Sequence, residues 1–162
     1  MKDELTLLQQ QDLSSLFADF LDPDEIVLGT IKPNKSRFYK NLAFPFAIPL
    51  FWPHFILIVV CTLGIFPFVT MAKSYKNLCY AYTNKRLITR SGTFGVSFFG
   101  IEYKDIVATS VDTTILDKRT HTGSLLFRSY HSSIRFNGVE NPYELMRKIK
   151  EVMPAREEPI QQ

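Results

Sequence analysis

Nine basic side chains and no acidic one occur between residues 31 and 90, on both sides of a long uncharged stretch. Lysine and arginine next to an apolar segment are typical of a membrane-proximal surface that attracts anionic lipid headgroups. An alternative is that these charges only set the orientation of the membrane segment and bind no specific ligand. We call the nine residues the basic collar: Lys32, Lys35, Arg37, Lys40, Lys73, Lys76, Lys85, Arg86 and Arg90.

The sequence contains no recognisable arrangement for catalysis or metal binding. His54, His121 and His131 are widely separated, and none is followed four residues later by a carboxylate or a histidine. Cys61 and Cys79 have neither the spacing of a metal site nor that of a disulfide framework. We expect Cys79 to be a strand residue, with palmitoylation as the alternative. We therefore predict that the protein is not an enzyme and has no catalytic residue, metal or cofactor.

The uncharged stretch covers residues 42–72, which is 31 residues without Asp, Glu, Lys or Arg. A straight helix of this length would measure about 46 Å, against roughly 30 Å of hydrocarbon in a bilayer. Two complete crossings would need about 40 residues and a turn. The run is therefore long for one crossing and short for two.

Prolines favour a break inside this run. Pro45, Pro49 and Pro53 recur every four residues and disfavour a straight helix. Trp52, Pro53 and His54 together predict a turn, so we expect residues 41–74 to form a helical membrane hairpin, either re-entrant or thinly spanning. A single tilted span and a buried hairpin in a soluble protein are the alternatives.

Charge is divided unevenly along the chain. Residues 1–30 carry a net charge of −6, residues 31–90 carry +9, and residues 91–162 carry none. Because the last segment is neutral, it lacks the basic face of a nucleic-acid-binding module. Basic flanks on both sides of the apolar run predict that both termini and the C-terminal domain lie on the cytoplasmic side of a membrane.

The first 22 residues predict an amphipathic helix, with leucine and phenylalanine at three- and four-residue spacing over residues 3–21. It either packs on its own domain or docks a partner protein. Residues 23–40 are expected to contain a strand at 25–31 and a basic juxtamembrane segment.

Short β segments follow the apolar run, and residues 75–153 predict one domain. Strands are expected at 80–83, 87–89, 96–103, 106–114, 124–130 and 133–137, followed by a helix at 142–153. Asn141 and Glu144 suggest a capping box at its start. The predicted fold is an antiparallel sheet or partly open barrel closed by this helix. Residues 154–162 are expected to be a disordered tail.

Several motifs in this domain resemble one known family. The motifs are YAYTNKRLITRSG at residues 80–92, IEYKDI at 101–106, GSL at 123–125 and FNGVENPYEL at 136–145, with EIV at 25–27 upstream. In this order they are similar to the bacterial pleckstrin-homology-like (PH-like) domains of small membrane proteins, in which the domain follows an apolar hairpin. The resemblance covers roughly residues 24–152.

The resemblance implies a membrane-anchored α+β protein: a helical membrane hairpin plus a PH-like antiparallel β-barrel or sheet capped by a C-terminal helix. PH-like folds host many unrelated binding roles, so the fold alone does not define the ligand. We expect an interaction or adaptor protein in contact with membrane lipids that binds a protein partner or assembles with itself. The alternative is an anionic-lipid headgroup-binding module that uses Lys85, Arg86 and Arg90. Nucleic acid is not an expected partner.

Overall fold

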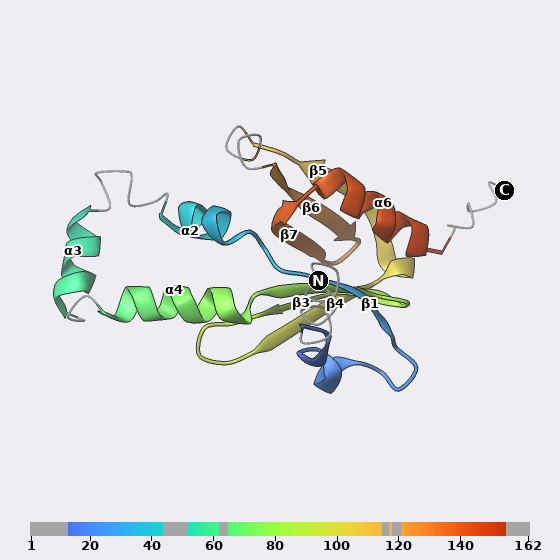
Figure 1. Cartoon of the computed structure of the whole chain (residues 1–162), viewed down its shortest axis with the longest axis horizontal. Helices are drawn as coiled ribbons and strands as arrows, with labels where there is room; N and C mark the ends of the chain where they lie inside the picture. Colours follow the sequence, from blue (N-terminus) through green and yellow to red (C-terminus); the bar gives the residue numbers. More distant parts are fainter. Residues whose placement is uncertain (1–12, 44–51, 62–64, 115–116, 118–120, 155–162) are drawn as a thin grey trace, which may run out of the picture.

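The computed structural model describes residues 13–43, 52–61, 65–114, 117 and 121–154 of the 162-residue chain. Two antiparallel sheets and a C-terminal helix form one end of the molecule, and three helices extend from it to the other (Figure 1). The expected disordered tail lies almost entirely outside the described residues, as do the first 12 residues of the expected N-terminal helix.

The first sheet contains four strands in the order β1-β2-β3-β4, all antiparallel. Their bounds are β1 Val27–Ile31, β2 Cys79–Thr83, β3 Arg86–Ser91 and β4 Ser97–Glu102. The strands β2 and β3 form the hairpin expected around Asn84 and Lys85. At the irregularity in the β1–β2 pairing, Gly29 lies against the Tyr82 ring, where a Cβ atom would overlap the ring. Glycine therefore permits the close approach of these two strands.

The second sheet contains β5 Ile106–Asp112, β6 Thr122–Ser129 and β7 Ser133–Glu140 in consecutive antiparallel order. A short 3-10 helix, η4 Tyr103–Asp105, connects β4 to β5. Inward-facing residues alternate with exposed ones along β7, the pattern of a strand with one buried face.

The main hydrophobic core lies between the sheets and helix α6 Pro142–Val152. The Tyr80 ring from the first sheet stacks on the Phe136 ring from the second, with centroids 4.6 Å apart. Met146 and Ile149 of α6 are buried in the same cluster. This arrangement confirms the predicted antiparallel β domain with a C-terminal helix.

Of the two predicted forms, an antiparallel sheet or a partly open barrel, the barrel is wrong, because the two sheets are hydrogen-bonded separately and do not close on each other. The η4 turn redirects the chain between β4 and β5, and the described strand pairings include no β4–β5 ladder. Side-chain packing in the core joins the sheets in its place.

The predicted capping box is also wrong. Asn141 has a left-handed backbone, with φ 47°, and its side chain makes no capping hydrogen bond. Glu144 instead forms an ion pair with Lys148 one turn along the helix, at 2.9 Å. Proline at the first helical position still fits, because its missing N–H would have no intrahelical acceptor.

Residues 13–21 pack against the outer face of the first sheet. Phe17 is fully buried against Cys79, Ala81 and Ile88, and the Phe20 ring stacks on Phe98 at 5.0 Å. Of the two interpretations of the N-terminal helix, this packing favours the intramolecular one for these residues. The local structure is a short helical turn followed by the 3-10 helix η1 Ala18–Phe20.

Three helices are inserted between β1 and β2: α2 Lys35–Ala43, α3 Trp52–Cys61 and α4 Ile65–Asn77. They form the left end of the molecule in Figure 1. The residues expected to be a basic juxtamembrane segment thus include a helix, α2.

A membrane-spanning hairpin is not supported. Among the described residues, no helix has both the length and the apolar character that a bilayer crossing requires. The 10 residues of α3 and 13 residues of α4 correspond to about 15 Å and 20 Å at 1.5 Å per residue. The described part of the apolar run thus contains two helices that are each shorter than a bilayer crossing.

Candidate functional site

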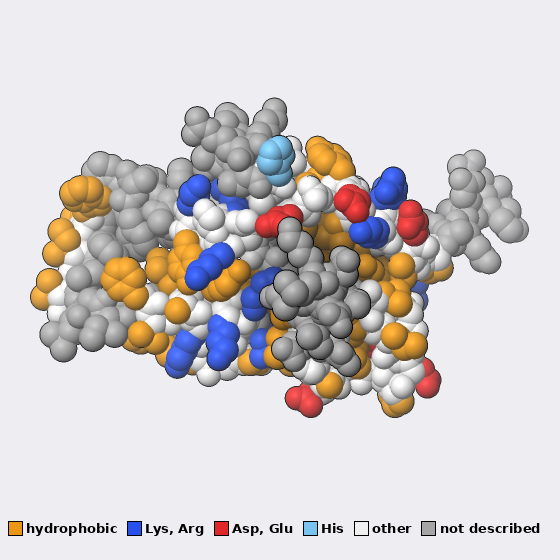
Figure 2. Space-filling view, viewed as in Figure 1, with side chains coloured by type: hydrophobic (Ala, Val, Ile, Leu, Met, Phe, Trp, Pro, Cys, Tyr) orange, Lys and Arg blue, Asp and Glu red, His pale blue; other side chains and the backbone are white. Residues whose placement is uncertain are grey.

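The described parts of α3 and α4 expose an apolar surface that we call the hairpin tip. Its seven large side chains are each at least 41% exposed: Trp52, Ile56, Leu57, Val60, Phe66, Phe68 and Val69. In Figure 2 hydrophobic side chains gather at this left end of the molecule. Scattered apolar residues are normal on protein surfaces, whereas a concentration of large ones marks an interaction site.

The expected turn at Trp52, Pro53 and His54 is instead the start of α3, and all three residues are exposed. Proline is tolerated here because first-turn N–H groups have no intrahelical acceptor. The connection from α3 to α4 falls on residues 62–64, outside the described residues.

Two cations of the basic collar fasten the end of α4 to the first sheet. The Lys32 ammonium donates to the Lys76 carbonyl at 2.8 Å, and Arg90 Nη1 donates to the Asn77 carbonyl at 3.1 Å. Positive side chains are favourable here because the last carbonyls of a helix carry partial negative charge. Burial lowers the pKa of Lys32, and nearby Arg90 and Lys76 act in the same direction.

Aromatic packing joins α4 to α2. The Tyr75 ring lies 5.3 Å from the Phe38 ring and 5.9 Å from the Tyr39 ring, measured between centroids. The Tyr75 hydroxyl also donates to the Pro33 carbonyl at 3.0 Å. The orientation of α4 relative to the sheets is therefore fixed by several independent contacts.

Four lysines of the collar have exposed side chains around these helices: Lys35, Lys40, Lys73 and Lys76. Figure 2 shows Lys and Arg side chains gathered beside the apolar left end. The sequence contains no acidic residue from position 26 to position 101, so no carboxylate in this segment neutralises them. Together they give the base of the hairpin tip a positive rim.

Arg37 of the collar is buried instead of exposed. Its Nε donates to Asp117 at 2.6 Å and its Nη2 donates to Thr114 at 3.0 Å. Burial raises the pKa of the Asp117 carboxyl, but hydrogen bonds from Thr114 and Arg37 outweigh this effect and lower it overall. Arg37 thus connects α2 to the segment after β5.

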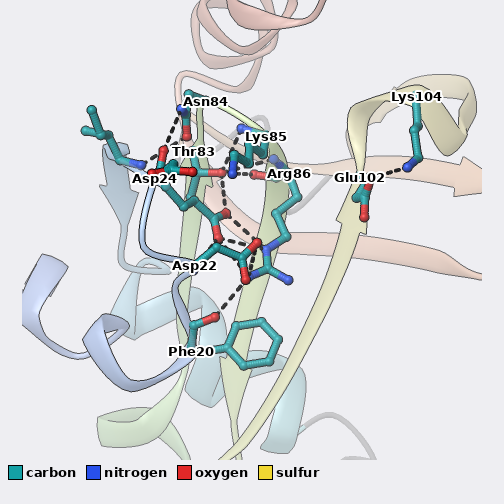
Figure 3. Close-up of polar contacts among 11 residues, drawn as sticks. Phe20, Asp22, Asp24, Thr83, Asn84, Lys85, Arg86, Glu102 and Lys104 are labelled. Atoms are coloured by element: carbon teal, nitrogen blue, oxygen red, sulfur yellow. Dashed lines mark hydrogen bonds and ion pairs between the residues drawn. The ribbon is translucent and has the colours of Figure 1, made fainter.

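Arg86 is also held in an ion pair, with Glu25. Figure 3 labels Arg86 together with its neighbours Phe20 and Thr83. The Nη2 atom of Arg86 lies 2.7 Å from the Glu25 carboxylate, whose side chain is fully buried, and also donates to the Phe20 carbonyl at 2.9 Å. The Thr83 hydroxyl donates a further bond to Glu25 at 2.7 Å. Burial raises the pKa of Glu25, but the bonds from Arg86 and Thr83 prevail and lower it overall.

Lys85 and Arg86 lie at the end of the first sheet opposite α4. The strand β2 begins directly after α4 and runs away from it for five residues, or about 16 Å, before reaching this turn. Their proximity in sequence to the apolar run therefore does not bring them near it in space. The structure divides the predicted collar into a group around α2 and α4 and a separate pair at the far end.

Side chains that could support other chemistry are dispersed. Cys79 is buried in β2, where burial raises the pKa of its thiol; this matches the strand interpretation and disfavours palmitoylation of the folded chain. His54, His121 and His131 are exposed and lie on α3, before β6 and in the β6–β7 turn. Within the described part of the chain, no group of three His, Cys, Asp or Glu side chains is arranged to hold a metal ion.

Sequence analysis missed Phe94, which lies in the β3–β4 loop and is 71% exposed. Its ring lies 5.9 Å from the Phe66 ring of α4, so the loop extends the apolar surface of the hairpin tip. The sequence did contain a signal for this exposed residue, because Phe94 lies in a predicted turn between Gly92 and Gly95. Large apolar side chains are unusual at such a position.

A family model described as "Bacterial PH domain" matches residues 38–153, which is most of the chain. This chain belongs to the bacterial PH domain family. The match begins in α2 and ends after α6, so it includes α3, α4 and six of the seven strands. No curated protein matches the chain.

Two solved structures show a similar fold to this bacterial PH domain protein. A pleckstrin homology domain from Shewanella amazonensis has a TM-score of 0.51 and 15% sequence identity, covering 90% of this chain and 89% of that one. A DUF1696 family protein with a pleckstrin-homology domain from Shewanella loihica has a TM-score of 0.49 and 12% identity, covering 90% and 97%. The likeness to the Shewanella amazonensis structure supports the two-sheet fold and carries no information on function.

Proposed function

We propose that this bacterial PH domain protein is a membrane-attached, non-enzymatic adaptor whose hairpin tip inserts into one face of a bilayer. The PH-like domain would then be held beside the lipid surface, where it binds a protein partner or a second copy of itself. Because α3 and α4 are short, we propose a re-entrant insertion, with both termini on the same, cytoplasmic, side.

The observation that supports this proposal is the exposed apolar surface of α3 and α4. Moving one large apolar side chain from water into an apolar environment contributes about 1.5–3 kcal/mol. Seven such side chains on adjacent helices would provide strong attachment even if each is only partly buried. Leaving them in water would favour aggregation.

The charges around the hairpin tip favour lipid over a protein partner as its occupant. Exposed lysines surround its base, and the segment from residue 26 to residue 101 contains no carboxylate. Each cation near an anionic lipid surface contributes on the order of 1 kcal/mol. This rim fits headgroup phosphates above an inserted apolar tip, the usual arrangement of interfacial helices.

The alternative, specific headgroup binding through Lys85, Arg86 and Arg90, has less support. Arg86 is held by Glu25, and Arg90 donates to the last carbonyl of α4. A headgroup site would have to use the exposed lysines near α2 and α4. Strict dependence of binding on one anionic lipid would favour this alternative.

The decisive experiment is vesicle flotation of the full-length protein with a hairpin-tip variant. Ile56→Ser, Leu57→Ser and Val60→Ser are combined, because all three side chains are exposed in α3. A loss of about 3 kcal/mol corresponds to an affinity decrease of about 100-fold. The matched control combines Ile26→Ser and Leu28→Ser, which are exposed at β1 and distant from α3.

Equal binding of parent and hairpin-tip variant would overturn the lipid role of the tip. Topology is tested separately with cysteine labels at residues 10 and 158 in sealed membranes, where opposite accessibility would overturn the re-entrant arrangement. Sedimentation in mild detergent then distinguishes self-assembly, seen as a defined larger species, from binding to a different protein.

A further inference from the structure

The β3–β4 loop, residues 92–96, runs along the side of α4. Asn77 donates to the Gly92 carbonyl at 3.0 Å, and the hydroxyls of Ser74 and Thr93 are 2.6 Å apart. In Figure 1 the loop projects from the sheet and lies alongside α4. Two polar contacts thus attach the loop to the helix that carries the hairpin tip.

Two contacts then hold the apolar end of the loop next to the hairpin tip. The Lys73 ammonium lies 5.4 Å from the centroid of the Phe94 ring, and the Phe66 ring lies 5.9 Å from it at an interplanar angle of 22°. The loop therefore follows α4 from its last turn toward its first. This course brings Phe94 onto the same apolar surface as the α4 side chains.

The loop has the residues of a tight turn that exposes a large apolar side chain. Gly92 has φ 133°, and a Cβ atom there would overlap the Gly95 carbonyl. This conformation favours glycine and closes the loop. Phe94 and Val96 are left 71% and 44% exposed.

Such a loop suits the boundary between headgroups and hydrocarbon. An exposed aromatic ring provides apolar area, while the ammonium above it reaches the phosphates, and the neighbouring serine, threonine and glycine residues tolerate a polar interface. A protein partner would be expected to supply carboxylates opposite these lysines, but a bilayer supplies phosphates without requiring shape complementarity.

We propose that the β3–β4 loop is a second lipid-contacting element, which inserts Phe94 next to α4 and fixes how the PH-like domain lies on the bilayer. This inference rests on the proposed insertion of the hairpin tip. Two attached elements on one side restrict rotation about the hairpin. The β2–β3 turn, with Lys85 and Arg86, would then face away from the lipid.

Fluorescence quenching in bilayers tests this geometry, because Trp52 is the single tryptophan of the chain. The parent reports the hairpin, and Phe94→Trp in a Trp52→Phe background reports the loop. The matched control is Tyr130→Trp in the same background, at an exposed position in the β6–β7 turn. This turn adjoins the start of β5 through the Ile106–Ser129 pair, at the end of the domain opposite α4.

The probe is a vesicle of phosphatidylcholine and phosphatidylserine containing brominated acyl chains. We expect quenching of tryptophan at positions 52 and 94 and none at position 130. Quenching at 52 without quenching at 94 would overturn the loop proposal and leave the proposed function in place. Quenching at neither position would overturn both, and equal quenching at 130 would overturn the fixed orientation.

A second measurement avoids the added tryptophan. Phe94→Ser should reduce affinity for the same vesicles several-fold, whereas Tyr130→Ser should not. Because Phe94 is exposed, thermal unfolding in detergent should be unchanged by the substitution. Unchanged vesicle affinity in Phe94→Ser would count against the loop even if hairpin-tip variants lose binding.

Discussion

At the β2–β3 turn, Arg86 is within 2.7 Å of a fully buried Glu25, and the pair fastens the N-terminal segment to the first sheet. At the opposite end of the same sheet, Lys73 and Lys76 are exposed with no acidic residue nearby in the sequence, next to exposed apolar helices. Both ends contain residues of the predicted collar. At the first end the charge of Arg86 holds the fold together, and at the second the side chains of Lys73 and Lys76 are exposed.

This comparison shows that a basic residue near an apolar run is not necessarily a membrane contact. What matters is whether a carboxylate is brought to it by the fold. At the β2–β3 end, residues distant in sequence supply carboxylates, as Asp22 and Glu25 do for Arg86. At the hairpin end, Lys73 and Lys76 of α4 lie in a stretch of sequence, residues 26–101, that has none.

The largest contrast should come from placing the same negative charge in the hydrophobic core of the β domain and on the exposed hairpin tip. Ile149→Asp puts a carboxylate into the core under α6, where the native side chain is fully buried, at a cost of about 4 kcal/mol or more. Leu57→Asp, on exposed α3, should change stability by less than about 0.5 kcal/mol. Urea unfolding in mild detergent measures both.

In vesicle binding the order is reversed, and Leu57→Asp should have the larger effect on affinity. An aspartate in the apolar region of a bilayer costs about 3 kcal/mol, so Leu57→Asp should lower affinity by about 100-fold. If Leu57→Asp destabilises the fold as much as Ile149→Asp does, α3 is packed within the protein and the comparison fails.

Removing Arg86 should be the next largest effect on stability. Arg86→Ala leaves the buried Glu25 carboxylate without its cation, and breaking such a pair costs about 3 kcal/mol. Lys85→Ala, at the adjacent exposed position, is the matched control and should change the unfolding free energy by less than about 0.5 kcal/mol. Equal effects of the two substitutions would show that the ion pair does not hold the N-terminal segment in place.

Acid should weaken the ion-paired end through Glu25. Its pKa is lowered in the folded state, so its stabilising contribution is present above the unfolded value of about 4.5 and is lost as pH falls through the folded pKa. Glu25→Gln should remove this contribution, giving lower stability at pH 7 and a flatter dependence below pH 4.5. Unfolding followed at several pH values tests this, and an unchanged acid limb in the variant would contradict it.

The smallest predicted effect concerns the lysine rim. Lys40→Gln should weaken binding to anionic vesicles by about 1 kcal/mol, roughly fivefold, and should have less effect in high salt. Lys150→Gln, at an exposed position on α6, should change binding little. Equal losses from both would mean that net charge alone, and not the rim around the hairpin tip, attracts the protein to the lipid.

Much of the fold followed from local sequence pattern. The alternating strands, the β2–β3 turn at Asn84 and Lys85, and the apolar face of α6 were predicted because each depends on residues close together in the chain. The predicted capping box of α6 is wrong, because Asn141 adopts a left-handed backbone and its side chain makes no capping hydrogen bond. The separation into two sheets depends on the η4 turn and was likewise not visible in local pattern.

The sequence by itself determined that this protein contains a PH-like β domain and a long apolar insertion with an excess of cations. Composition, periodicity and motif order carry that information, because each is a property of neighbouring residues. The tertiary structure alone decided which cations are available. Arg37 meets Asp117 across 80 residues and Arg86 meets Glu25 across 61, through strand register and helix docking that no local spacing encodes.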